Sequence, residues 1–157
     1  MRFISAFLVA SLLMSAGCGR SRSGTGDSAP IGQFHHEPPH GGTAVALGDD
    51  YNLELVRDAG AGTLSAYVFD DDMEYFVRSP APSITIMATA TGETRTLVLA
   101  AVANPATGET VGDTSLFQAQ ADWLRTTPDF SAKLLSIPVH GSTFTDVSFN
   151  FPAGNDK

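Results

Sequence analysis

The most constraining feature of this chain is an alternation of apolar and polar residues that runs, with interruptions, from Thr43 to Phe151. Side chains along a β-strand point to opposite faces in turn, so a period of two is typical of strands with one buried and one wet face. Clusters of Gly, Asp and Pro interrupt the alternation at short intervals and mark turns. The predicted strands are Thr43–Leu47, Tyr51–Arg57, Thr63–Phe69, Ser83–Ala88, Thr94–Val102, Leu116–Ala119, Lys133–Val139 and Thr143–Phe151.

The alternation also predicts which face of each strand is buried. The residues predicted to face the core are Leu53, Leu55, Leu64, Ala66, Val68, Ile84, Ile86, Leu135, Ile137, Val139, Val147, Phe149 and Phe151. Those predicted to face water are Asn52, Glu54, Ser65, Ser83, Thr85, Ser148 and Asn150. Short strands with one wet face favour an all-β fold, either an antiparallel two-sheet, Ig-like sandwich or an open barrel. Helical periodicity is nearly absent, and one helical turn is predicted at 122–125, before Pro128.

The N-terminus has the pattern of an export signal. Arg2 supplies a positive charge, and an apolar run follows to residue 13, which is too short for a helix that needs about 20 apolar residues to span a membrane. Small residues at 15–17 then lead into Cys18, the only cysteine of the chain. This junction resembles the lipobox that lipoprotein signal peptidase cleaves. The resemblance implies a signal peptide at 1–17 and a lipid anchor on Cys18.

Residues 18–33 are predicted to be a lipidated flexible tether, because this stretch holds little apolar material and no periodicity. Residues 34–157 form the predicted β-domain. Removal of Arg2 with the signal leaves eight basic residues against seventeen acidic ones, and such an acidic surface repels nucleic acid. Gly19 follows the anchored cysteine, where Asp retains many lipoproteins at the inner membrane. We therefore expect the periplasmic side of the envelope, with the outer membrane favoured.

Three of the four histidines lie within six residues, in the segment that leads into the first predicted strand. Imidazole is the commonest nitrogen ligand for zinc, copper and nickel, and a carboxylate can complete the coordination. The candidate ligands are His35, His36, His40 and Glu37 for one ion of Cu, Zn or Ni. The alternative is a solvated linker whose histidines are exposed, because this spacing is not a closed ligand signature.

The fourth histidine, His140, precedes Gly141 in a predicted hairpin turn, where residues with positive φ are required. Turn formation is one role, and a fourth metal ligand is the other. The acidic run Asp70–Glu74 follows a predicted strand and is interpreted as a solvated turn. Two alternatives there are a hard cation such as calcium on the carboxylates, and a soft copper site that includes Met73.

Sequence motifs for catalysis are absent. The chain has no GxSxG, no HExxH, no phosphate loop and no dinucleotide fingerprint, and its cysteine is assigned to the lipid. We therefore expect a protein that is not an enzyme.

The run His40–Thr43, followed by Leu53–Val56 and Leu64–Val68, resembles small secreted bacterial lipoproteins whose His-Gly-Gly segment opens a β-rich domain. Similar segments occur near the N-terminus of periplasmic adaptor subunits of heavy-metal efflux systems. The resemblance implies a periplasmic accessory domain near metal efflux, with His35, His36 and His40 as ligands.

Together these patterns predict a non-catalytic lipoprotein that binds a transition metal and assists metal handling or efflux. One alternative is a metal-free envelope lipoprotein that binds another protein through its β-domain. A second alternative is a carbohydrate-binding domain, which requires aromatic rings on one exposed face. The aromatic residues considered for that face are Trp123, Tyr51, Tyr67 and Tyr75.

Overall fold

The computed structural model describes residues 37–155, which contain eight strands and one short 3-10 helix. The strands are β1 (Thr43–Leu47), β2 (Tyr51–Asp58), β3 (Thr63–Asp70), β4 (Ser83–Ala90), β5 (Glu93–Ala101), β6 (Leu116–Gln120), β7 (Phe130–Val139) and β8 (Ser142–Phe151). The helix η1 covers Asp122–Arg125. All eight predicted strands and the predicted helical turn are confirmed, with ends displaced by at most three residues.

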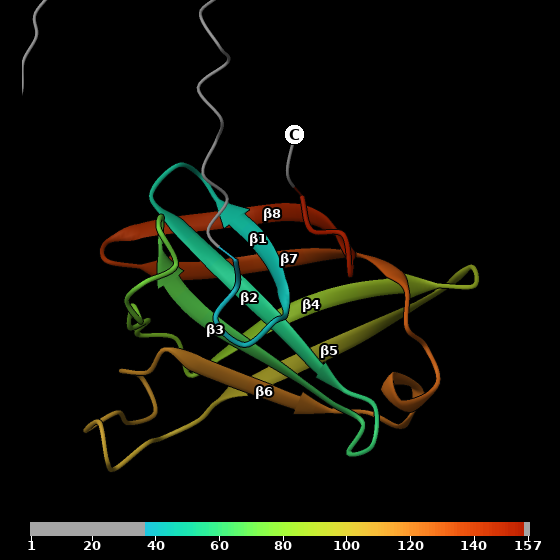
Figure 1. The fold of residues 1–157 in the computed structure, drawn as a ribbon, viewed down its shortest axis with the longest axis horizontal. Coiled ribbons are helices and arrows are strands. Elements are labelled where there is room, and N and C mark those ends of the chain that lie inside the picture. The colour runs from blue at the N-terminus through green and yellow to red at the C-terminus, as the bar shows by residue number, and fades with distance from the viewer. Residues whose placement is uncertain (1–36, 156–157) are drawn as a thin grey trace, which may run out of the picture. The chain divides into compact units, whose positions relative to one another are not determined.

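The strands form one antiparallel sheet in the order β1-β2-β3-β6-β5-β4-β7-β8. The sheet curls so that β1, β2 and β3 cross in front of β7 and β4, and its two end strands approach each other (Figure 1). The all-β prediction is confirmed. Of the two predicted arrangements, the open barrel describes this single curled sheet.

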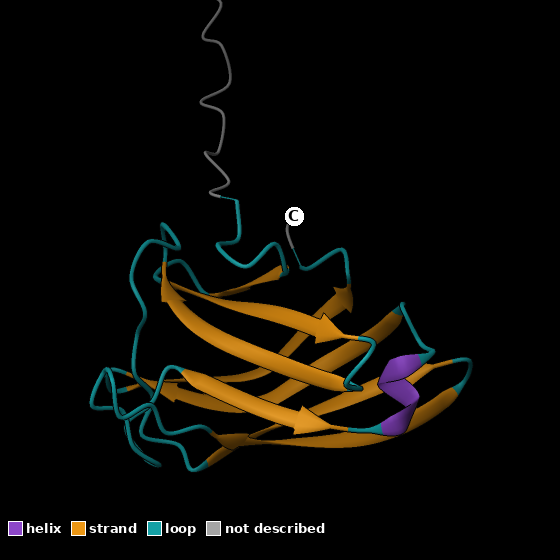
Figure 2. Cartoon of the chain, turned by 60° about the horizontal axis from the view of Figure 1, so that its bottom comes forward, coloured by secondary structure: helices purple, strands orange, loops and turns teal. Residues whose placement is uncertain are grey.

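The core fills the space inside the curled sheet. Its largest fully buried side chains come from every strand except β8 and from η1: Phe117, Leu47, Leu53, Leu55, Leu64, Ile84, Ile86, Leu99, Leu124, Leu134 and Ile137. The helix lies at one end of the curled sheet (Figure 2) and contributes Leu124 to the core. Within residues 37–155, no helix is both long enough and apolar enough to cross a membrane.

The prediction that Leu135 faces the core is wrong. The inward side chains of β7 are Phe130, Ala132 and Leu134 in its first half, but Ile137 and Val139 in its second half. The register with β8 is the same on both sides of this shift, and Asp146, at the corresponding point of β8, has a φ of 54°. The β7–β8 pair therefore changes its inward face here. Leu135 is only half-buried, and so is Val147 on β8.

The seam between β1 and β8 is closed by the segment that follows β8. The Thr43 hydroxyl donates to the Pro152 carbonyl over 3.1 Å. The Asn155 side-chain amide bonds both backbone groups of Ala46, accepting from its N–H at 2.8 Å and donating to its carbonyl at 3.1 Å. Asn155 thus takes the place of a strand residue beside β1, satisfying backbone groups that another strand would otherwise pair.

Gly154 sits so close to β1 that no side chain fits there. An ideal Cβ at Gly154 would lie 2.4 Å from the Ala44 carbonyl oxygen, and its φ is 85°. Gly141 has nearly the same φ, 86°, but an ideal Cβ there meets nothing within 4 Å.

We predict that Gly154→Ala destabilises the domain more than Gly141→Ala does. Both substitutions carry the left-handed backbone cost of about 1–2 kcal/mol, but only Gly154→Ala adds a steric clash, on the order of 1–3 kcal/mol. Urea unfolding of both variants measures the difference between their free energies of unfolding. Equal losses would show that the seam is not tightly packed.

Candidate functional site

The His-Gly-Gly segment folds back over the outer face of β2 and β3. Its turn is closed by the Gly41 N–H, which donates to the Pro38 carbonyl over 2.8 Å. Gly42 then passes so close to β2 that an ideal Cβ would lie 2.5 Å from the Leu55 carbonyl oxygen. Only glycine permits this approach, which brings the backbone of residues 40–42 over Glu54.

Glu54 is the centre of this arrangement, and the prediction that it faces water is wrong. Its side chain is fully buried, although its neighbours Leu53 and Leu55 point to the core on the opposite face. Its Oε1 accepts from the backbone N–H groups of His40, at 2.8 Å, and Gly42, at 2.9 Å. Its Oε2 lies 2.7 Å from the Nδ1 of His40. The carboxylate is buried because the His-Gly-Gly segment covers it and supplies three hydrogen-bond donors.

The His40 ring lies in a cluster of aromatic side chains. It stacks on Tyr67 with ring centroids 4.1 Å apart and an interplanar angle of 12°. Phe69 and Phe76 flank it, with centroids at 6.2 and 6.1 Å. Glu54 is opposite Tyr67 in the β2–β3 register, so the carboxylate and the aromatic platform occupy adjacent strands.

This geometry fixes what the His40 ring can do chemically. A carboxylate only accepts hydrogen bonds, so the Nδ1 atom carries the proton that it donates to Glu54. In a neutral imidazole the Nε2 atom then keeps its lone pair, and 36% of the side chain is exposed. The arrangement can bind a metal ion or accept a hydrogen bond through one oriented nitrogen atom.

The other predicted ligands have different surroundings. Glu37 is exposed, and His35, His36 and Cys18 lie outside the described residues. His140 is in the β7–β8 hairpin with a φ of 45°, which confirms its turn role, and its ring meets the edge of Tyr51 at 6.0 Å. Across residues 37–155, no three side chains of His, Cys, Asp or Glu are grouped to hold a metal ion.

The acidic run 70–74 forms a turn stabilised by its own first residue. The Asp70 carboxylate accepts from the backbone N–H groups of Glu74, at 2.9 Å, and Tyr75, at 3.1 Å. Met73 adopts a φ of 57° and is buried, with 4% of its surface exposed. The following aromatic residues are exposed: Tyr75 by 69% and Phe76 by 55%.

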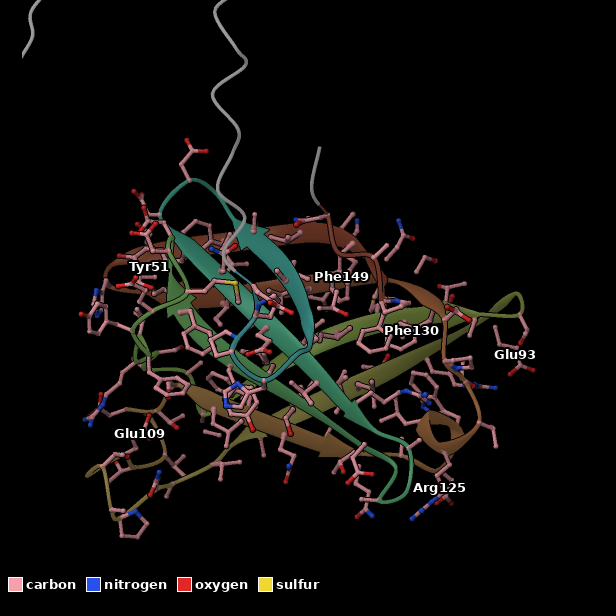
Figure 3. The ribbon with its side chains drawn as sticks, in the orientation of Figure 1. Tyr51, Glu93, Glu109, Arg125, Phe130 and Phe149 are labelled. Carbon is pink, nitrogen blue, oxygen red and sulfur yellow. The ribbon has the colours of Figure 1, made fainter. Side chains whose placement is uncertain are left out.

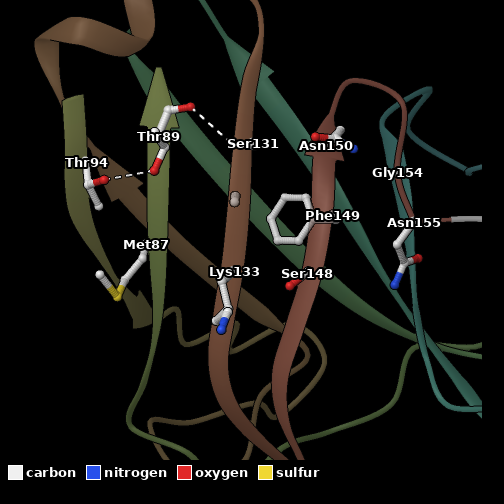
Figure 4. Close-up of a pocket in the computed structure, with 11 residues that line it drawn as sticks. Met87, Thr89, Thr94, Ser131, Lys133, Ser148, Phe149, Asn150, Gly154 and Asn155 are labelled. Carbon is white, nitrogen blue, oxygen red and sulfur yellow. Dashed lines mark hydrogen bonds between the residues drawn. The ribbon is translucent and has the colours of Figure 1, made fainter. Parts of the chain in front are cut away.

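A groove of about 650 Å³ lies on the outer face of β4, β7 and β8 (Figure 4). Its lining is mostly hydroxyl and amide side chains, and some of these bond one another: the Thr89 and Thr94 hydroxyls are 2.9 Å apart. The four aromatic residues considered for carbohydrate binding are elsewhere. Trp123 packs against Phe130, and Tyr67 lies under His40.

A second buried carboxylate, Glu109, organises the loop between β5 and β6 (Figure 3). Its Oε1 accepts from the backbone N–H of Ser115 at 2.8 Å and from the Ser115 hydroxyl at 2.6 Å, and its Oε2 accepts from the Thr107 hydroxyl at 2.7 Å. Burial alone raises the pKa of Glu109, but these hydrogen bonds, with the nearby Arg78 charge, outweigh it and lower the pKa overall. No local sequence pattern predicts the burial of Glu109.

We predict that Glu109→Gln flattens the acid dependence of stability. Because the pKa of Glu109 is lowered by folding, its carboxylate stabilises the fold above the ordinary glutamate pKa, about 4.3, and this contribution is lost as pH falls through the lowered value. The free energy of unfolding should therefore fall more for the parent than for the variant between about pH 7 and about pH 3. Denaturant titrations at both pH values measure it, with exposed Glu74→Gln as the control. A variant that loses as much as the parent would contradict this role.

Comparison with known proteins adds no relative from which a function can be transferred. No protein-family model, no curated protein and no solved structure matches this chain. The similarity of the His-Gly-Gly segment to periplasmic lipoproteins and efflux adaptors therefore stays a prediction from the sequence.

Proposed function

We propose that this chain is a lipid-anchored protein of the bacterial envelope that binds one transition-metal ion, Cu, Zn or Ni, through its N-terminal histidines. In this proposal the protein sequesters the ion or hands it to a metal-efflux or envelope protein, and it catalyses no reaction. Cys18 carries the lipid, residues 18–33 form the tether, and the β-domain stands on the periplasmic side, with the outer membrane favoured.

The observation that carries the metal proposal is the bond between His40 Nδ1 and the buried Glu54 carboxylate, 2.7 Å long. Histidine ligands in metal sites usually donate their second ring N–H to a carboxylate or carbonyl, which fixes the tautomer and raises the basicity of the coordinating nitrogen. Stacking on Tyr67 fixes the ring plane as well. His40 is therefore oriented before any ion binds, which lowers the entropy cost of coordination.

The remaining ligands in the proposal come from the same segment. His36 is four residues from His40 and His35 is five, and a segment of this length can bring their imidazoles to an ion bound at the oriented ring. Glu37 is exposed and available as an oxygen ligand. Two or three imidazoles with one carboxylate suit Zn, Cu and Ni better than Mg or Ca.

A metal-free interaction function is the second candidate. Tyr75 and Phe76 expose 69% and 55% of their surfaces, and Phe76 lies beside His40. Exposed aromatic side chains are enriched where proteins bind one another. In this candidate the Glu54–His40 contact only fastens the His-Gly-Gly segment to the sheet.

The metal proposal predicts a large effect of Glu54→Gln on affinity. A glutamine amide still accepts through its oxygen, but its nitrogen cannot accept from Nδ1, so the His40 tautomer is no longer imposed. We expect metal affinity to fall about 10- to 100-fold, and a His35→Ala/His36→Ala/His40→Ala variant to lose at least about tenfold, roughly 1.4 kcal/mol. Titration calorimetry of the purified protein with Cu(II), Zn(II) and Ni(II) measures this.

The matched control is Glu109→Gln, which changes a second buried carboxylate whose hydrogen-bond partners are Thr107 and Ser115 rather than a histidine. It should bind the ion as the parent does. For the parent we expect a dissociation constant in the low micromolar range or tighter, which corresponds to a binding free energy of about 8 kcal/mol in magnitude. Binding should weaken on acidification because protons compete with the metal for neutral imidazole. If the parent binds only near millimolar, or if Glu54→Gln binds as tightly as the parent, the interaction function replaces the metal function.

The anchor proposal predicts that Cys18→Ser releases the protein from membranes, because the acyl chains supply about 0.8 kcal/mol per buried methylene and the tether holds no comparable apolar segment. Fractionation of cells that express the full chain measures the membrane-bound share. His40→Ala, which leaves the cysteine in place, is the control and should stay with the membrane. Full sedimentation of the Cys18→Ser protein with membranes would exclude the lipid anchor.

A further inference from the structure

Within residues 37–155, one long strand edge of the sheet has no neighbouring strand. β5 pairs with β4 along its whole length, from Glu93 opposite Ala90 to Ala100 opposite Ser83. On its other side it pairs with β6 only at Ala100↔Gln118 and Ala101↔Phe117. β5 and β6 then diverge, so residues 93–99 of β5 form an open edge.

The hydrogen bonds near the end of β5 show which backbone groups face this edge. The Ala101 N–H donates to the carbonyl of Pro82, which lies directly opposite on the β4 side, over 3.0 Å. The Val102 N–H donates to the carbonyl of Leu116 on the β6 side over 2.8 Å. Since these directions alternate along a strand, the N–H and C=O groups of Thr94, Thr96 and Val98 point away from β4. Six backbone polar groups therefore line the open edge.

The side chains at this edge do not block the approach of another strand. Thr94 and Thr96 are exposed, and Val98 is 58% exposed. Beside them on β4, opposite Thr96, Met87 is 38% exposed. Natural sheets usually protect such edges with charges, prolines, bulges or a covering segment. Residues 94–98 contain no proline, and their one charged residue, Arg95, lies over the Trp123 ring at 5.5 Å and pairs with Glu93.

The two end strands of the sheet are protected in this way. Asn155 covers the β1 edge by bonding Ala46, and β8 carries a charged residue with positive φ, Asp146. The open edge of β5 is also close to electrically neutral, because Glu93 and Arg95 pair within the chain. The whole chain has a net charge of −8, so copies repel one another over most of their surface but not along this edge.

We propose that β5 pairs with β5 of a second copy of the chain, antiparallel and about a two-fold axis at Thr96. In this register Thr96 faces its own equivalent, and Thr94 faces Val98 of the partner subunit. All three edge residues of each copy then form ladder hydrogen bonds, and Val98 is covered.

The two neighbouring registers are less stable. A shift of two residues toward the β4–β5 hairpin places Arg95 opposite the partner's Arg95, and like charges directly opposite each other are destabilising. A shift of two residues the other way places Thr94 opposite the partner's Ala100, whose backbone groups already face β6. The proposal is independent of metal binding and of the lipid anchor.

Disulfide cross-linking of the full chain tests the register. Residues directly opposite in such a pair have Cα atoms about 5.5 Å apart, within the range of a disulfide. We expect Thr96→Cys, after mild oxidation, to give a product of twice the chain mass on a non-reducing gel. The unchanged chain, which contains Cys18, sets the background, and Ser148→Cys, at an exposed position of β8, is the matched control. A Thr96→Cys yield no higher than these controls would overturn the proposal, as would a cross-link to a protein of another mass.

Sedimentation of the purified chain in mild detergent gives a second readout that needs no cysteine. Thr96→Lys places two ammonium groups opposite each other at the axis, and we expect the dimer dissociation constant to rise at least about tenfold. Ser148→Lys adds the same charge on β8 and should dimerise as the parent does, and circular dichroism checks that both variants fold. A parent that stays monomeric at about 200 µM, or a Thr96→Lys variant that dimerises as tightly as the parent, contradicts the pairing.

Discussion

The burial of the Glu54 carboxylate decides how the N-terminal side of this domain is built. An ionised carboxylate without partners is costly to remove from water, and Glu54 is fully buried. Its cost is offset by the backbone N–H groups of His40 and Gly42 and by the His40 ring. These donors come from a segment without regular structure, whose own N–H groups need an acceptor. The carboxylate and the segment therefore satisfy each other, and loss of either leaves the other with unpaired polar groups.

The same interaction links fold to proposed function. Glu54 lies on β2 between neighbours on β1 and β3, so its position is fixed by two ladders of backbone hydrogen bonds. The His40 ring is held in turn by its 2.7 Å hydrogen bond to Glu54 and by its stacking on Tyr67. An imidazole at the end of a polar segment would otherwise sample many orientations. Here, one nitrogen is held by the carboxylate and part of the ring is exposed, which suits a metal ligand or a specific contact with another protein.

Local patterning predicted the strands well because each strand carries its own period of two. In β1, for example, the buried Val45 and Leu47 alternate with the half-buried Ala44 and Ala46. The alternation places Glu54 toward water because it indicates which face of the sheet a residue is on, but not which segment covers that face. It places Leu135 in the core because it continues one period along β7, whereas the inward face of β7 changes midway. The order of strands and the divergence of β5 from β6 depend on pairings between distant residues, which no local pattern contains.

The tail that closes the seam also brings the two ends of the domain together. Thr43, near its start, bonds Pro152, near its end, and Asn155 bonds Ala46. Ends this close can be joined by a short linker, and new ends can be opened in an exposed hairpin such as Thr91-Gly92. The domain is therefore suited to circular permutation. In the permuted protein the His-Gly-Gly segment would lie in the middle of the chain, joined through the new linker to the residues that follow β8.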